Sequence, residues 1–561
     1  MKKVLALILA IIMIVTVFAS CNSDKDSSCA HVDKVLDHIC DICGANVGTH
    51  ADKANDNDHK CDYCKVAMSV CDDSDNDGFC DECGNSLGLE GVQNNNQSGD
   101  NQNGNLNGNQ NIVNQETLQD VQIPEYFDTQ TPITITFYHT MGQSLRDILD
   151  RYIWDFNKLY PNITIQHEQV GGYDDVRDQI KTEITVGCQP NIAYCYPDHV
   201  ALYNLAKAPV SMDNLISSNM EITRIDGTTE ILGLTQAQQD DFIKGFYDEG
   251  KAFGDGEMYT LPLSKSTEVL YYNKTFFDKH NLKVPTTWDE MEEVCAKIKE
   301  IDPASIPLGH DSESNWFITM CEQLDSPYTS ATGEHFLFDN ETNRNFVKKF
   351  RDWYHKGYVT TQDIAGGYTS SLFTKSEGEV GKSYMTIASS AGATHQRPYK
   401  VNGKYSFEVG IATVPQVDAN NPKVISQGPS LCIFNKENTQ EVLASWLFVK
   451  FLTTNVEFQA EFSMVSGYMP VIKSVMNDAI YKEAFLDRAN GGDNITALAI
   501  KVGLEQANAY YVSPAFNGSS VARDEVCKLM QKCFTAKTDN VDGMIMKAFA
   551  DAIEECKYRV G

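Results

Sequence analysis

The chain has 561 residues, of which 46 are basic and 77 acidic, so its formal net charge is -31 at pH 7. A chain of this length predicts more than one folding unit. Negative charge repels phosphate backbones, which argues against nucleic acid as a partner. A charged, solvated surface accounts for most of this excess.

The first 20 residues are typical of an export signal. Two lysines precede an apolar run over residues 4–19, which is shorter than the roughly 20 residues of a spanning helix. Small residues then precede Cys21, an order similar to the lipobox of bacterial lipoproteins, although Phe18 stands where leucine is usual. We therefore predict acylation of Cys21 and a lipid-anchored location on the extracytoplasmic face of the cell membrane. The alternative is an ordinary cleaved signal.

Residues 21–88 form a segment rich in Cys, His and Asp with a short repeat. Cys-x-x-Cys pairs begin at positions 40, 61 and 80. Such pairs with nearby histidines have the spacing of tetrahedral zinc sites, and the acidic stretch before the last pair resembles half of a calcium loop. The alternatives are disulfides, expected in an oxidising compartment, or unstructured thiols. The candidate metal ligands are Cys40, Cys43, Cys61, Cys64, Cys80, Cys83, His38 and His59.

Residues 89–123 are rich in Asn, Gln and Gly. A segment with so few apolar groups cannot build a core, which predicts a flexible linker. A linker of this size spans roughly 30 Å on average.

Residues 124–561 have the composition of a folded α/β domain. TPITITFYH, residues 131–139, predicts a buried strand. Residues 144–159 place leucines, isoleucines and aromatic residues on one helical face, and NITIQHEQV follows as a second strand. Strand, helix and strand at this spacing predict a βαβ unit of a parallel sheet, in which ligands bind beyond the carboxyl ends of the strands.

Four further segments carry a family resemblance. They are YTLPLSKSTEVLYYNKTFFDKHNLKVPTTWDEM (259–291), GKSYMTIASSAGATHQ (381–396), VISQGPSLCIFNKENTQEVLASWLFVKFLTTNVEFQAEFSMVSGYMPV (424–471) and AYYVSPAFNGSSVAR (509–523). Together with the opening βαβ unit, they resemble the extracellular solute-binding proteins of ABC importers, the sugar-type group. In the segment 259–291, we expect Thr287 or Thr286 to cap a helix, with Glu290 as capping-box partner of Thr287.

The resemblance implies a two-lobed fold of the periplasmic-binding-protein type, with a hinge between the lobes. Lobe 1 is expected over about 124–266 and 424–462, and lobe 2 over about 267–423 and 463–561. The implied function is to bind a carbohydrate in the cleft, close on it and deliver it to the membrane subunits of the importer. The resemblance implies a monomeric binding protein that is not an enzyme and needs no cofactor in this domain.

Residues at the expected crossings and strand ends are the candidate ligand contacts. Polar groups would bind hydroxyls, and Trp316 would stack on a sugar ring. The candidates are His139, Met141, Gln143, Asp198, Ser264, Lys265, Trp316, Ser389, Ser390, Gln427, Gly428, Tyr468 and Asn517. His139 and the two serines can instead satisfy backbone groups at strand ends, and Asp198 can instead cap a helix. Trp288, Trp353 and Trp446 are expected in the core.

Other functions stay open at this point. Serine-rich loops and Lys265 would also suit a phosphorylated polyol such as glycerol phosphate. An exported glycoside hydrolase would need a carboxylate pair that no motif places. A third alternative is an adhesion or metal-scavenging protein that acts through its cysteine repeat. The eight cysteines from Cys188 to Cys556 lack metal spacing and are expected to be mostly buried, small apolar side chains.

Overall fold

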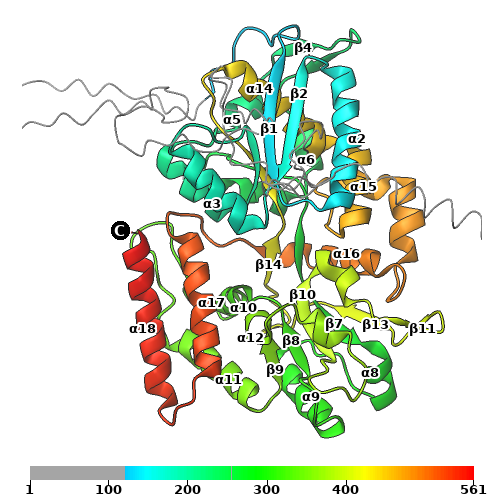
Figure 1. The fold of residues 1–561 in the computed structure, drawn as a ribbon, viewed down its shortest axis with the longest axis vertical. Helices are drawn as coiled ribbons and strands as arrows, with labels where there is room; N and C mark the ends of the chain where they lie inside the picture. Colours follow the sequence, from blue (N-terminus) through cyan, green and yellow to red (C-terminus); the bar gives the residue numbers. More distant parts are fainter. Residues whose placement is uncertain (1–120, 254–255, 561) are drawn as a thin grey trace, which may run out of the picture. The chain divides into compact units, whose positions relative to one another are not determined.

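The computed structural model describes residues 121–253 and 256–560, which form two lobes, each built around its own sheet (Figure 1). The sheet of the first lobe has the order β2-β1-β3-β15-β6. Its strands are β1 Ile133–His139, β2 Ile163–Gln169, β3 Ile192–Cys195, β6 Leu261–Pro262 and β15 Ser430–Ile433. β1 pairs in parallel with β2 and β3, and β15 is antiparallel to both β3 and β6. The opening βαβ unit predicted from the sequence is confirmed.

The longer helices cover this first sheet with apolar side chains. In α2, Ile148, Leu149 and Phe156 are buried, three residues that the helical pattern had placed on one face. The helices are α2 Gln143–Leu159, α3 Tyr173–Ile184, α4 Pro197–Tyr203, α5 Asp213–Ser217, α6 Gln236–Asp241, α7 Lys244–Asp248, α14 Thr439–Thr454 and α15 Val456–Ser466. A small hairpin, β4 Glu221–Thr223 and β5 Thr229–Ile231, lies in the same part of the chain. Trp446 is fully buried among these elements, as expected.

The second lobe is built on a sheet of order β16-β14-β7-β10-β8-β9, with β13 also paired to β7. Its strands are β7 Ser266–Asn273, β8 Leu308–His310, β9 Val359–Thr361, β10 Met385–Ser389, β13 Val409–Ala412, β14 Val424–Gln427 and β16 Tyr510–Tyr511. A two-stranded ribbon comprises β11 Lys400–Val401 and β12 Lys404–Tyr405. The fold class predicted from the sequence, a two-lobed α/β protein, is confirmed.

The helices of the second lobe surround a core rich in aromatic rings. Trp288, Trp353 and Phe350 pack there, so the expectation of core positions for both tryptophans is confirmed. The helices are α8 Lys274–His280, α9 Trp288–Ile301, α10 Glu313–Gln323, α11 Glu341–His355, α12 Gln362–Ala365, α13 Ser370–Phe373, α16 Ile495–Glu505, α17 Ser519–Thr535 and α18 Val541–Val560. Figure 1 shows α17 and α18 side by side at the C-terminus.

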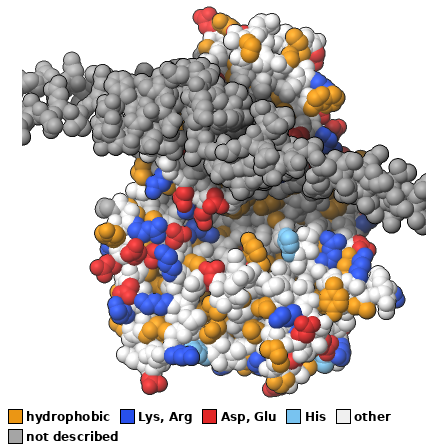
Figure 2. Space-filling view, viewed as in Figure 1, with side chains coloured by type: hydrophobic (Ala, Val, Ile, Leu, Met, Phe, Trp, Pro, Cys, Tyr) orange, Lys and Arg blue, Asp and Glu red, His pale blue; other side chains and the backbone are white. Residues whose placement is uncertain are grey.

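Short helical turns complete the fold. They are η1 Asn204–Ala206, η2 Glu249–Lys251, η3 Ser390–Gln396, η4 Lys473–Asn477, the π-helical turn η5 Ile480–Phe485, η6 Leu486–Arg488 and η7 Ala507–Ala509. On the face in Figure 2, acidic and basic side chains lie intermixed over the second lobe. Ion pairs such as Lys532–Asp551 on α17 and α18 follow this pattern.

Strand pairing places the crossings between lobes differently from the predicted boundaries. β14 belongs to the second sheet, so the return crossing follows this strand, at Gly428 and Pro429, rather than preceding it at residue 424. Val475 and Tyr481, predicted in lobe 2, pack into the core of the first lobe. The reason is that short apolar segments near a crossing fit either sheet, and only their packing assigns them.

The helix cap predicted before Trp288 is present with a changed partner. Thr287 Oγ1 accepts a hydrogen bond from Glu290 N at 3.2 Å, as expected of the cap. The Glu290 carboxylate instead accepts from Thr286, through N at 2.8 Å and Oγ1 at 2.7 Å. The reciprocal half of the predicted capping box is therefore displaced by one residue.

Candidate binding cavity between the lobes

A cavity of about 370 Å³ is lined by residues of both lobes. The first lobe contributes the beginnings of α3 and α4, and the second contributes the beginnings of α10 and α17. The lining residues are Tyr173, Asp174, Arg177, Tyr196, Pro197, Asp198, His199, Glu249, Ser314, Asn315, Tyr328, Thr329, Ile425, Ser426, Gln427, Val512, Ser513, Pro514, Ser519, Ser520, Arg523, Asp524 and Cys527. Because both lobes contribute walls, a solute held here would contact both and favour their closure.

Tyrosines form the wall of the first lobe. Gly171, with φ of +35°, and Gly172 turn the chain after β2, and Gly172 N donates to Asp175 at 2.6 Å, which starts α3 with Tyr173. The Tyr173 ring lies 4.8 Å from that of Tyr196, between ring centroids. An aromatic wall of this kind suits the apolar faces of sugar and polyol carbons.

Arg523 is the principal cation of the second wall. It lies in the first turns of α17, which begins after Gly518 in the left-handed region at φ +117°. Its Nη2 donates to Asn315 Oδ1 at 2.6 Å. Burial lowers the pKa of Arg523, but nearby Asp198 and several tyrosines outweigh it and the net shift is upward. The guanidinium therefore carries a full positive charge at the cavity.

The other charged groups at the cavity have protein partners. Arg177 pairs with Asp174 at 2.9 Å, and Glu249 pairs with Lys265 at 2.8 Å. Among the residues that the structure describes, no carboxylate lies within ion-pair distance of Arg523. Arg523 is thus the cation with capacity left for an anionic group, and the N-terminal N–H groups of α17 beside it favour the same sign of charge.

Asp198 joins the two lobes across the cavity. Ser520 Oγ, on α17, donates to its Oδ2 at 2.9 Å. Burial raises the pKa of Asp198, but His199, Arg523 and the Ser520 bond outweigh this effect and lower it. The carboxylate is therefore ionised at neutral pH and can accept hydroxyl hydrogen bonds with its remaining lone pairs.

Several buried polar atoms at the cavity lack a protein partner within the described ranges. They are His199 Nδ1, Tyr328 OH, Gln427 Oε1 and Ser513 Oγ. Burial lowers the pKa of His199, so its imidazole is neutral and can donate and accept. Unpaired buried polar groups are costly in an empty site. Hydroxyl groups of a solute, or water in its absence, are the natural partners for this set.

Two predicted ligand residues, Asp198 and Gln427, line the cavity. Tyr468 lies next to it, with its hydroxyl oxygen 3.4 Å from that of Tyr173. Asn517 is half-buried just before α17, but it is not part of the lining. The predicted residues Asp198, Gln427 and Asn517 thus lie in three chain segments that meet at the cavity, although Asn517 itself does not line it.

The predicted residues at the crossings serve the joint between the lobes. Lys265 is fully buried, and its Nζ donates to Glu249, Gly428 O and Ser430 Oγ at 2.8, 3.2 and 3.0 Å. Ser264 is buried beside it and Gly428 adopts φ of +95°, where a Cβ would lie 2.6 Å from Ser264 O. These residues pack the crossings against each other and lie outside the cavity lining.

Trp316 is placed where it cannot act as a stacking platform in this conformation. It is fully buried, stacks on His310 with ring centroids 4.8 Å apart, and also packs on Trp288. The polar residues around it in the sequence belong to the start of α10, whereas the indole faces the core. The direction of the Trp316 side chain depends on its position around the helix, and the polarity of its neighbours in the sequence does not reveal that position.

The remaining predicted contacts also have structural partners. His139 Nε2 lies 2.8 Å from His167 Nδ1, and His139 Nδ1 accepts from Met141 N at 3.1 Å. Gln143 is exposed and bonded to Asp147. Ser389 Oγ accepts from Ala391 N, and Ser390 Oγ accepts from Thr267 N. His139, Ser389 and Ser390 thus hydrogen-bond to backbone groups at strand ends, which was the alternative to ligand contact in the sequence analysis.

Residues missed by the sequence reasoning include Tyr173, Arg177, Tyr196, His199, Asn315, Tyr328 and Arg523. Tyr196 and His199 flank Asp198 in CYPDHVALY, and Arg523 ends the segment AYYVSPAFNGSSVAR. Their proximity to recognised segments was the available signal. Asn315 directly precedes the predicted Trp316 and so had this signal. Tyr328 had none, because it reaches the cavity only through the packing of the second lobe.

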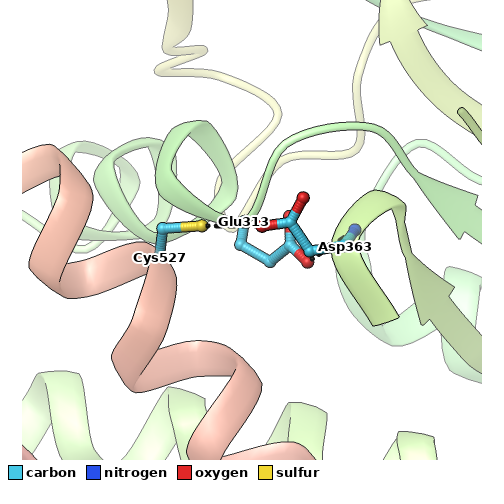
Figure 3. Close-up of side chains that lie close together, drawn as sticks. All are labelled: Glu313, Asp363 and Cys527. Carbon is cyan, nitrogen blue, oxygen red and sulfur yellow. Dashed lines mark hydrogen bonds between the residues drawn. The ribbon is translucent and has the colours of Figure 1, made fainter. Parts of the chain in front are cut away.

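Glu313, Asp363 and Cys527 lie close together at one edge of this region (Figure 3). Cys527 Sγ lies 3.3 Å from Asp363 Oδ2, and Asp363 N donates to Glu313 Oε1 at 3.2 Å. Burial raises the pKa of both Glu313 and the Cys527 thiol. We interpret the cluster as a hydrogen-bonded contact between α10, α12 and α17.

The remaining cysteines of the domain follow the sequence expectation in most positions. Cys195, Cys295, Cys321, Cys432, Cys533 and Cys556 are buried, whereas Cys527 is half-buried and Cys188 is exposed; all eight are free thiols. Cys21 and the candidate metal ligands of residues 21–88 lie outside the described residues. None of the helices in the described ranges has the length and apolar character needed to cross a bilayer.

Comparison with known proteins agrees with this geometry. The family model "Bacterial extracellular solute-binding protein" matches residues 151–486. The sn-glycerol-3-phosphate-binding periplasmic protein UgpB of Escherichia coli K12 is 23% identical over 386 residues, covering 66% of this chain and 81% of its own. The counterpart from Shigella flexneri shows the same identity and coverage.

Solved structures show the same fold. UgpB from Mycobacterium tuberculosis, in complex with glycerophosphocholine, has a TM-score of 0.59 at 17% identity, covering 76% of this chain and 98% of that one. The cyclic α-maltosyl-1,6-maltose binding protein from Arthrobacter globiformis has a TM-score of 0.57 at 18% identity, covering 76% and 100%.

The fold is two-lobed, and a candidate binding cavity lies between the lobes. Because the family model matches more than half of the chain, the chain belongs to the bacterial extracellular solute-binding proteins. The family resemblance predicted from the sequence is confirmed.

Proposed function

We propose that this protein is the extracytoplasmic receptor of an ABC importer, and that its solute is a polyol or sugar derivative carrying a phosphate group. The observation that carries the proposal is Arg523, a half-buried guanidinium at the cavity with no carboxylate of the described residues in ion-pair distance. Charge-assisted bonds from arginine are well suited to phosphate oxygens. UgpB relatives named for glycerol 3-phosphate and glycerophosphocholine support the same choice.

The rest of the cavity suits the polyol part. Asp198 and the unpartnered Tyr328 OH and Gln427 Oε1 offer acceptors and a donor for hydroxyl groups. The rings of Tyr173 and Tyr196 offer an apolar face. A solute with hydroxyls at one end and an anion at the other would use both walls.

A neutral carbohydrate is the second candidate. The stacked tyrosines favour it, since they would act equally on an uncharged sugar ring. Structural relatives whose names include maltose derivatives support this alternative. The homologues are binding proteins, and a role without catalysis is part of the proposal.

A solute screen on the matched variants Arg523→Gln and Lys532→Gln tests the first candidate. Both remove one positive charge from α17, but Lys532 pairs with Asp551 away from the cavity lining. We expect calorimetry with sn-glycerol 3-phosphate to show about 30-fold weaker binding for Arg523→Gln. Lys532→Gln should match the unmodified protein. Tight binding of maltose and none of glycerol 3-phosphate would favour the neutral carbohydrate instead.

Membrane attachment and metal binding remain proposals for the N-terminal part. We propose lipid attachment at Cys21, and Cys21→Ser should abolish incorporation of labelled palmitate and release the protein from membranes. Unchanged labelling would contradict the anchor.

For the Cys-x-x-Cys repeat we propose zinc or a mixed metal. Metal content and free-thiol counts on the full chain separate this from disulfides in the repeat, which would give no metal and leave only the thiols of the solute-binding domain free.

A further inference from the structure

Glu268 is a buried carboxyl group behind the cavity wall. It lies on β7 and is 2% exposed. Its Oε1 accepts from Asn315 Nδ2 at 3.2 Å, whereas Oε2 has no hydrogen-bond partner among the described residues. Burial raises its pKa to about 8, against a smaller opposing effect of the Asn315 bond. An oxygen without a donor, in a buried group, is a natural place for a proton.

Asn315 connects this carboxyl group to the cavity. Its amide donates to Glu268 on one side and accepts from Arg523 Nη2 at 2.6 Å on the other. Asn315 is 2% exposed, so water does not compete for these bonds. The bond to Glu268 therefore fixes which face of the amide points at Arg523, and Arg523 reaches the cavity from this anchor.

We propose that Glu268, acting through Asn315, is a positioning residue that couples the binding of an anionic solute at Arg523 to the uptake of a proton. The proposal rests on the proposed function, because it needs an anion at Arg523. Ionised Glu268 partly offsets the charge of Arg523. A bound anion adds negative charge nearby, disfavours the ionised carboxylate and so favours its protonation. By linkage, protonation of Glu268 strengthens anion binding by the same factor.

The other groups around Glu268 do not supply this coupling. Asp311 raises its pKa and Arg523 lowers it, and these are the charged groups that act on it. Tyr511, from β16, has a pKa raised far above the range in question. The residues facing it from β10 and α16 are neutral: Ser389 pairs with it across the strands, and Gln506 Nε2 donates to its backbone oxygen at 3.0 Å.

Calorimetry of the full chain with sn-glycerol 3-phosphate tests the coupling. Between pH 7.5 and 9.5 the phosphate, whose second pKa is about 6, no longer titrates. We expect the dissociation constant to rise about five- to 20-fold over this range, as Glu268 loses its proton in the free protein. Titrations in two buffers of different ionisation enthalpy should show net proton uptake that is greatest between the pKa of Glu268 in the free protein and its higher pKa in the solute-bound protein.

The variant Glu268→Gln keeps the acceptor for Asn315 but cannot ionise. We expect it to bind the solute with a nearly flat pH profile and no proton uptake. Glu183→Gln is the matched control, because burial also raises the pKa of Glu183, but this residue of α3 lies outside the cavity lining. The control should keep the pH profile of the unmodified protein.

Three outcomes separate the hypotheses. Binding by the unmodified chain without proton uptake overturns this inference alone, as does an unchanged pH profile in folded Glu268→Gln. Absence of any binding of anionic solutes overturns the proposed function and this inference with it. If Glu268→Gln does not fold, the proton count on the unmodified chain decides.

Discussion

The two walls of the cavity differ in what they offer a solute. The first lobe provides tyrosine rings and charges that are already paired, such as Arg177 with Asp174. The second provides Arg523 on α17, with a buried amide and carboxyl group behind it. The comparison teaches that one wall suits any polyhydroxylated solute, whereas the other discriminates by charge. We therefore expect selectivity for an anionic solute to depend on the second lobe.

We expect the largest effect from a substitution in the joint between the lobes, where the crossings pack together. Lys265→Ala removes the partner of Glu249, and both side chains are almost fully buried. An uncompensated buried charge costs about 3–5 kcal/mol, so we expect a decrease of this size in the free energy of unfolding, measured with urea. Lys244→Ala, which breaks the exposed pair with Asp248, is the control and should have a much smaller effect. Equal effects would contradict the importance of the joint.

Each lobe also contains a buried neutral histidine, so we expect low pH to destabilise both lobes. Burial lowers the pKa of His139, in the first lobe, and of His310, in the second, to about 3. Below pH 6.5 these histidines are protonated in the unfolded chain but stay neutral in the folded lobes. The free energy of unfolding therefore decreases as pH falls from 6.5 towards 3. At pH 5 each histidine should cost about 2 kcal/mol relative to pH 7.5.

The replacements His139→Gln and His310→Gln check this assignment. Each should flatten part of the fall in unfolding free energy between pH 7 and 5, and the double variant should flatten more. His355→Gln, in the last turn of α11, is the control and should keep the original slope. A slope that neither replacement changes would show that other groups cause the acid sensitivity.

The smallest expected effect concerns the aromatic wall. Tyr173→Ala removes a ring that packs on Tyr196 and faces the cavity, and we expect about 1 kcal/mol weaker binding of glycerol 3-phosphate. If the first lobe acts without regard to charge, a neutral glycerol derivative should lose a similar amount. Tyr126→Ala, at an exposed position, is the control. A loss confined to the anionic solute would contradict the division between the walls.

Local patterns in the sequence were sufficient for the opening elements of the domain, whereas the two-lobed fold class came from the family resemblance. The alternation in TPITITFYH and the apolar stripe of residues 144–159 gave a βαβ unit with the predicted parallel pairing. The cap at Thr287 is likewise local, because it depends on residues three positions apart. The core positions of Trp353 and Trp446 followed from helical spacing with apolar neighbours.

The candidate site was less predictable, because its residues meet only after the lobes have folded. Asp198 was found from a strand end and Gln427 from an expected crossing, but Lys265 belongs to the joint and Trp316 to the core. The direction in which a side chain points depends on the turn of its helix and on what packs against it. Neither is encoded in the polarity of its neighbours along the chain.

By itself, the sequence determined the export signal pattern, the opening strand, helix and strand of the domain, and the family. Only the tertiary structure decided which residues form the cavity, that Arg523 lies there without a carboxylate partner among the described residues, and that Asn315 connects it to Glu268 behind the wall. The physical reason is how far apart the interacting residues lie along the chain. Backbone and helix patterns depend on neighbours a few residues apart, whereas Glu268, Asn315 and Arg523 come from three distant elements that only the packed second lobe brings together.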